Sequence, residues 1–105
     1  MIIYNVTTKV NARVAEEWQK WMLELHIPHV LESGCFLQAT ISLLLDVDDE
    51  DGPTYAVQYF AEDRTKYEQY INEYAPLLRK EVIEKWGDAC VSFRSTMQVI
   101  GQCDK

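Results

Sequence analysis

Residues 2–10 read Ile-Ile-Tyr-Asn-Val-Thr-Thr-Lys-Val, and this stretch together with the helical pattern after it decides the fold. The apolar or aromatic side chains on one side of this stretch are Ile2, Tyr4, Val6 and Val10, and they alternate with polar residues. This alternation and the many β-branched residues predict a strand with one buried face. From Asn11, which we place at a helix N-cap, the apolar positions change to helical spacing: Val14, Trp18, Trp21, Met22 and Leu25.

The first helix meets two terminating signals. Pro28 lacks an N–H group, so it is expected to break or kink the helix. Ser33-Gly34 is expected to end it, with glycine at the C′ position. Two extended runs follow, Cys35–Leu45 and Thr54–Phe60. The polar turn over residues 46–53 predicts that these runs pair as a hairpin.

A second helix is expected to start at a cap formed by Asp63 or Thr65 and to stop at Gly87. Its apolar positions change phase beyond Pro76, which predicts a kink or two short helices. A last strand alternates between residues 91 and 99. The order β-α-β-β-α-β predicts one ferredoxin-like α+β domain over residues 1–105. Its four-stranded antiparallel sheet would carry two helices on one face.

The face of this sheet that carries no helices is expected to contact a partner. Two helices cover only one face, and the strands keep large apolar side chains in both alternating sets. The uncovered face is expected to mix such residues with polar ones: Asn5, Gln38, Thr40, Gln58, Arg94 and Gln98. Two copies packed sheet against sheet with two-fold symmetry would enclose a small barrel. We therefore predict a homodimer through the sheet face, and a monomer with a solvated polar face is the alternative.

Composition excludes several classes of partner. The chain has 10 Lys plus Arg against 17 Asp plus Glu, a formal charge of −7, which argues against nucleic acid and anionic membrane surfaces. No apolar run is long enough to cross a bilayer, and the first residues lack the pattern of a secretory signal. The three cysteines, Cys35, Cys90 and Cys103, form no CxxC pair or short disulfide framework. This cysteine usage is typical of a reduced, cytoplasmic protein.

Metal binding is not expected. The only histidines, His26 and His29, have a spacing that could bring both imidazoles to one ion. Zinc needs a third and a fourth ligand, however, and no HExxH pattern is present. Structural roles for both histidines are the simpler interpretation. The acidic turn over residues 46–52 has Asp51 and Val57 where a calcium loop needs glycine and glutamate.

A small-molecule pocket between helices and sheet is the other role open to these residues. Imidazole titrates near neutral pH, which suits a general base or a hydrogen-bonding group. Flat aromatic side chains could form the walls, with Tyr70 among them, and a guanidinium could meet an anionic group. The candidate ligand-binding residues are His26, His29, Trp18, Trp21, Tyr59, Tyr67 and Arg94. Equally, the aromatic residues could be core and Arg94 could pair with a carboxylate.

Several segments resemble a family of short bacterial proteins that is classified as a domain of unknown function. The matching segments are Met1–Val6, Trp18-x-x-Trp21-Met22-x-x-x-His26-Ile27-Pro28-x-Val30, Gly34–Phe36, Thr54–Phe60 and Tyr67-x-x-Tyr70. The resemblance covers nearly the whole chain. It implies a ferredoxin-like fold of the dimeric α/β-barrel kind, and it implies no activity because the family has no established one.

The segment from Trp21 to Val30 is also similar to the first helix of ethyl tert-butyl ether degradation-type proteins. Their wider group includes antibiotic-biosynthesis-type monooxygenases, haem-degrading enzymes and muconolactone isomerases. In several of these a helix-one histidine borders a pocket, a role that carries over to His26 alone. The similarity leaves three functions open: a small-molecule binder, a cofactor-independent monooxygenase- or isomerase-like enzyme, and a non-enzymatic dimerisation module. The cofactor stays unknown, with haem as one candidate ligand.

Overall fold

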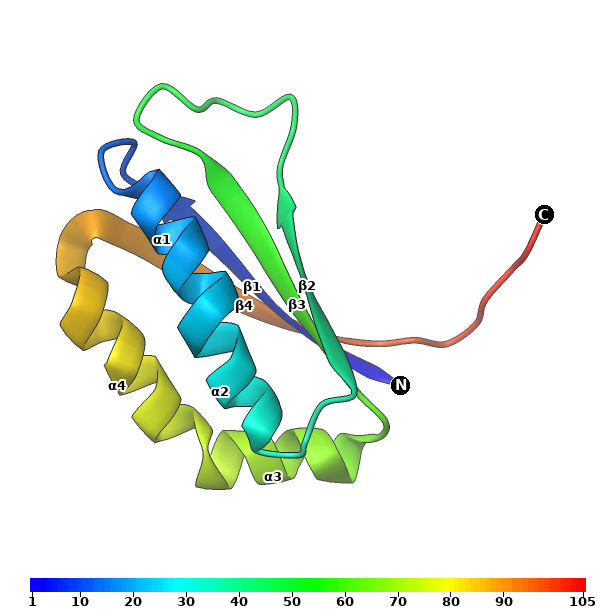
Figure 1. The fold of residues 1–105 in the computed structure, drawn as a ribbon. Coiled ribbons are helices and arrows are strands. Elements are labelled where there is room, and N and C mark those ends of the chain that lie inside the picture. Colours follow the sequence, from blue (N-terminus) through cyan, green and yellow to red (C-terminus); the bar gives the residue numbers. More distant parts are fainter.

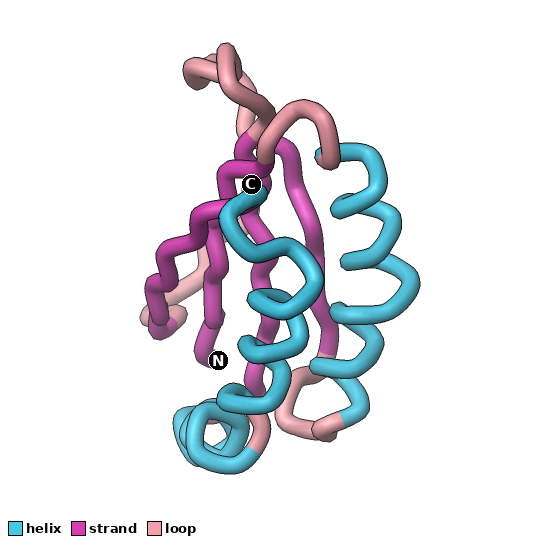
Figure 2. Tube along the Cα trace, turned by 90° about the vertical axis from the view of Figure 1, so that its left-hand side faces the viewer, coloured by secondary structure: helices cyan, strands magenta, loops and turns pink.

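The computed structural model describes residues 1–105. Its elements are β1 (Ile2–Val10), α1 (Ala15–Trp21), η1 (Met22–His26), α2 (Ile27–Glu32), β2 (Gln38–Leu43), β3 (Thr54–Ala61), α3 (Arg64–Glu73), α4 (Ala75–Trp86), η2 (Gly87–Ala89) and β4 (Cys90–Gln98). The strands form one antiparallel sheet in the order β2-β3-β1-β4, with the helices on one face (Figures 1 and 2). The predicted ferredoxin-like fold is confirmed. None of the helices combines the length and the apolar composition that spanning a bilayer requires.

The central strand β1 pairs with a neighbour on each side. Tyr4 lies opposite Tyr59 on β3 and opposite Thr96 on β4. The alternation predicted for β1 is confirmed, because Ile2, Tyr4 and Val10 are buried and most of their neighbours along the strand are less so. Strand β3 shows a regular alternation of buried and partly buried residues. The largest fully buried side chains are Trp18, Val10, Val30 and Val57. The core therefore lies between the central two strands and the first helix.

The first helix begins later than the prediction from Asn11. The Oδ1 atom of Asn11 accepts a hydrogen bond from the N–H of Arg13 at 2.9 Å, so the side chain stabilises a turn instead of a helix end. The backbone N–H of Val14 also donates to the carbonyl of Asn11 at 3.1 Å. Helix α1 then starts at Ala15 without a side-chain cap.

The interruption predicted at Pro28 takes the form of a π-helical turn just before the proline, and the helical region continues to Glu32. In this turn, η1, the N–H of Ile27 donates to the carbonyl of Met22, five residues back. Pro28 then lies in the first turn of α2, a position at which proline is tolerated. Helix α2 ends as predicted, with Gly34 in the left-handed region at a φ of 75°.

The second helical region divides close to the predicted place. Helices α3 and α4 meet at Tyr74 and run in different directions (Figure 1). Of the two candidate caps, Asp63 is the one used, since its Oδ1 accepts from the N–H of Lys66 at 2.9 Å. Strand β2 is shorter than the predicted run because Cys35 and Phe36 are buried in the connection from α2.

The prediction for the uncovered face is wrong at Arg94 and Gln98. The register places Arg94 opposite Val6 and Gln98 opposite buried Ile2, so both belong to the helix-facing side. Strand β4 lies at the edge of the sheet. Polar side chains on its helix-facing side, such as Arg94 and Gln98, can therefore reach solvent beside the helices. The opposite set of β4 contains polar Ser95 and three apolar residues, Val91, Phe93 and Met97, which are exposed by 72%, 65% and 40%. The uncovered face is therefore more apolar than predicted.

Candidate functional site

A cavity of about 40 Å³ lies between the helices and the sheet. It is bounded by β1, α1, η1, β3, α3, α4 and β4, and it adjoins a groove of about 200 Å³ between α4 and β4. The cavity and the groove share four lining residues: Arg79, Val82, Ser92 and Arg94. Since roughly 10–15 Å³ of such volume holds one water molecule, the inner cavity has the volume of a few waters.

Four of the candidate residues line this cavity: Trp18, His26, Tyr59 and Arg94. Tyr70, the further aromatic candidate, lines it as well. They come from five elements, so the fold brings together side chains that lie far apart in the sequence. Their roles in ligand binding stay predictions.

The other three candidates lie outside the cavity. The ring of Trp21 stacks on that of His26 with centroids 5.2 Å apart. The hydroxyl of Tyr67 shares a hydrogen bond of 2.9 Å with that of Thr96. His29 has a partly exposed side chain and pairs with Glu81. These three residues can support the cavity walls without contacting what the cavity holds.

His26 faces the cavity from the end of the π-helical turn. The residue is buried, with 7% of its surface exposed. Its Nδ1 atom lies 3.8 Å from Oε2 of Glu81, too far for a hydrogen bond, and has no hydrogen-bond partner. Burial lowers the pKa of His26, and the smaller attraction of Glu81 raises it again in part. The imidazole is therefore neutral at pH 7.

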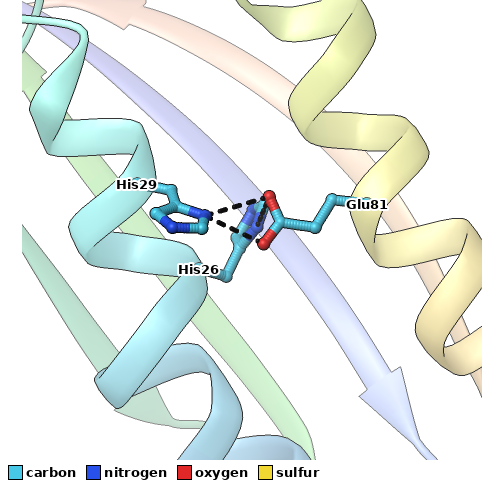
Figure 3. Close-up of polar contacts among 3 residues, drawn as sticks. All are labelled: His26, His29 and Glu81. Atoms are coloured by element: carbon cyan, nitrogen blue, oxygen red, sulfur yellow. Dashed lines mark hydrogen bonds and ion pairs between the residues drawn. The ribbon is translucent and has the colours of Figure 1, made fainter.

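Glu81 on α4 lies between the two imidazoles of α2 and η1 (Figure 3). The Nδ1 atom of His29 lies 3.0 Å and 3.3 Å from the two carboxylate oxygens of Glu81. The three side chains do not form a metal-ligating set. They join the first helical region to α4, and of the three only His26 lines the cavity.

We expect the free energy of unfolding to fall as the pH is lowered from about 7.5 to about 5. The lowered pKa of His26 means that the unfolded state binds more protons than the folded state below the ordinary value of 6.5, so acid favours unfolding. A His26→Gln variant should lose this part of the pH dependence, as measured by urea unfolding. A His29→Gln variant is the comparison and should keep most of it, because burial lowers the pKa of His26 more than the charge of His29 does. Equal slopes for the wild type and His26→Gln would contradict the assignment.

Two arginines meet at the phenol oxygen of Tyr4. The Nη2 atom of Arg79 on α4 and the Nε atom of Arg94 on β4 each donate to it at 3.0 Å. Neither guanidinium has a carboxylate within 4.0 Å. The sequence prediction missed Arg79. The sequence does contain a sign of its importance, because Arg79 is a charged residue within the apolar helical stripe of Ala75, Val82 and Trp86.

The cavity tyrosines are neutral donors. Burial raises the pKa of Tyr59, and the neighbouring phenols of Tyr70 and Tyr4 raise it further. Burial likewise raises the pKa of Tyr70, against a smaller opposite effect of Arg79 and Arg94. Both hydroxyls therefore keep their protons at physiological pH, and they can donate hydrogen bonds but supply no negative charge.

Together, the strand order and the helical layer define a ferredoxin-like protein with a small cavity between its helices and its sheet. Residues 1–100 match the family described as Domain of unknown function (DUF4286), and the chain belongs to this family. The resemblance to a family of this kind is thereby confirmed. A comparison with curated proteins finds no match.

Solved structures with the same fold include proteins of different kinds. HapK from Hahella chejuensis has a TM-score of 0.70 at 6% identity, over 100% of this chain and 98% of its own. A dimeric ferredoxin-like protein from an uncultured marine organism has a TM-score of 0.70 at 9% identity, and the match covers 99% of this chain and 98% of that protein. The heme-degrader MhuD from Mycobacterium tuberculosis, with two hemes bound in its active site, has a TM-score of 0.65 at 17% identity. The match covers 99% of this chain and 100% of that protein. Identities this low show the fold alone.

Proposed function

We propose that the protein is a homodimeric small-molecule-binding protein whose ligand occupies the cavity between the helices and the sheet. The observation that carries this proposal is a pair of buried donors at the cavity that have no partner. Both Nε1 of Trp18 and Nε of Arg79 are in this state. Buried polar groups are nearly always hydrogen-bonded in native proteins, so these two donors favour a site that a polar ligand completes.

The dimer part of the proposal rests on the uncovered face of the sheet. Val91, Phe93 and Met97 form an exposed apolar row on β4, and no helix covers that face (Figure 2). A second copy related by a two-fold axis would bury this row on both chains at once. The dimeric ferredoxin-like protein with the same fold supports an assembly of two chains.

A cytoplasmic location is part of the same proposal. The three cysteines, Cys35, Cys90 and Cys103, are all free. Unpaired thiols persist in reducing compartments, so this state supports the cytoplasm as the place where the protein works.

Haem does not fit this cavity. Sites for drug-sized ligands have volumes of about 300–1,000 Å³, whereas the cavity measures about 40 Å³ and its groove about 200 Å³. A ligand with one ring fits the two spaces far better. It would lie between the aromatic wall at Tyr59 and Tyr70 and the groove at Val82.

The test is a titration of the protein with benzamide, followed by the three tryptophan indole signals in an NMR spectrum. Trp18 and Trp86 both carry a buried, unpartnered indole N–H, but only Trp18 lines the cavity. We expect saturable movement of the Trp18 signal and little movement of the Trp86 signal. Equal movement of both signals, or none at saturation of the probe's solubility, would contradict the proposal.

A matched pair of variants locates the site further. His26→Ala removes the neutral imidazole from the cavity, and we expect benzamide binding to weaken about tenfold, the value of one hydrogen bond of about 1.4 kcal/mol. His29→Ala changes a residue of the same helical region that does not line the cavity, so binding should stay unchanged. Unaltered binding by His26→Ala would remove His26 from the site.

A further inference from the structure

We infer that the ligand is an anionic small molecule whose carboxylate or phosphate group is held by Arg79 and Arg94 around the hydroxyl of Tyr4. This inference rests on the proposed function and names the chemical class of its ligand. The three residues come from α4, β4 and β1 and line the same cavity.

The polar groups at this point are donors that lack an acceptor. The oxygen of Tyr4 already accepts from both guanidinium groups, so its own hydrogen is still available to donate. Arg79 donates to Tyr4 through Nη2, while its Nε is buried and has no partner. These two nitrogens form one edge of the guanidinium, which matches the two oxygens of a carboxylate or phosphate.

The charge balance points the same way. The chain has 17 acidic residues against 10 basic ones, yet no carboxylate is paired with Arg79 or Arg94. Two exposed cations elsewhere do have carboxylate partners, in the pairs Arg64–Glu68 and Lys80–Glu84. Two like charges that share one neutral oxygen repel each other, and a bound anion would convert this repulsion into attraction.

The position of the cluster indicates how the ligand would lie. Arg79 and Arg94 line both the inner cavity and the outer groove, whereas Trp18 and His26 line only the inner cavity. Arg94 is exposed and Arg79 is partly buried, so the anionic group would sit at the entrance. The uncharged end of the ligand would point inward, toward the unpartnered indole of Trp18 and the neutral imidazole of His26.

The test compares benzoate with benzamide, which have the same shape and differ in charge. We expect the Trp18 indole signal to report at least tenfold tighter binding of benzoate at low salt, and this preference should shrink as sodium chloride is added. Arg79→Gln and Arg94→Gln should each remove most of the preference, measured as the ratio of the benzoate and benzamide affinities of the same variant. Arg64→Gln, at a surface ion pair, should keep both affinities, and Arg94→Lys should retain an intermediate preference.

The outcomes separate this inference from the proposed function. If benzamide binds at Trp18 but benzoate binds no more tightly, or if both arginine variants keep the preference, the anion site is wrong and the cavity site stands. If neither probe moves the Trp18 signal, the proposed function itself fails. The salt dependence of the unmodified chain gives an answer even if a variant does not fold. Phenyl phosphate in the same titration distinguishes the anions, since the class that binds more tightly is the one the site takes.

Discussion

If the proposed homodimer forms through the sheet face, a Phe93→Glu variant is expected to stay a monomer of 12.3 kDa at concentrations at which the unmodified chain dimerises. Phe93 is 65% exposed on the uncovered face of the sheet, within the apolar row of β4. In a two-fold symmetric contact the substitution appears twice, so two carboxylates would be desolvated without a partner. We expect the dissociation constant to rise on the order of 1,000-fold, or about 4 kcal/mol.

Sedimentation over a range of concentrations measures this effect. Leu77→Glu is the matched control, because Leu77 is an equally prominent apolar residue, 74% exposed, but lies on α4 in the helical layer. It should leave the dimer intact. A wild-type chain that stays monomeric at all concentrations would overturn the dimer, and dissociation by Leu77→Glu alone would move the interface to the helices.

Gly52→Ala is expected to destabilise the fold by about 3–5 kcal/mol, more than an ordinary single substitution. Gly52 has a φ of 148°, a conformation that side chains rarely adopt. A Cβ atom there would collide with the carbonyl oxygen of Val10 and lie 2.7 Å from the nitrogen of Ala12. The residues on either side of Gly52 accept two backbone hydrogen bonds from the end of β1 and the turn after it. The N–H of Val10 donates to the carbonyl of Pro53, and the N–H of Ala12 donates to the carbonyl of Asp51. Relief of the collision would disturb both.

Gly34→Ala separates the collision from the strain of the backbone angle. Gly34 also has a positive φ, of 75°, but no atom lies within 4 Å of its added Cβ. Its cost should be only about 1–2 kcal/mol, the penalty of the left-handed conformation alone. Urea unfolding of both variants measures the difference, and equal losses would show that the close approach to β1 has no energetic importance.

The fold was predictable because the strongest signals were local. The alternation in β1 and the glycine stops at Gly34 and Gly87 all correspond to features of the structure. Pro28 indicated an interruption of the helix, but a proline alone does not indicate that the interruption is a π-helical turn before it. Arg94 was placed on the wrong face because the alternation in β4 suggests that its mainly apolar set faces the helices, whereas the pairing with β1 puts the polar set on that side.

The site was predictable only in part, for a physical reason. Trp18 and His26 stood out because bulky or titratable side chains are conspicuous within a helical stripe. Arg79 did not, because its importance comes from Tyr4 and Arg94, which are 75 and 15 positions away in the sequence. Such a cluster exists only once the sheet has paired β1 with β4 and α4 has packed beside them.

The place of β1 between β3 and β4 also affects how the chain reaches its folded state. The first strand of this fold to leave the ribosome is the central one, and one of its two neighbours is the last strand to be made. Side chains that bond across β1 and β4 are separated by 84 and 90 positions, so this half of the sheet closes the longest loops in the chain. Contacts between residues so far apart in the sequence slow folding. Until β4 arrives, the nascent chain carries one open edge of β1, and a chaperone or a neighbouring chain can pair with it.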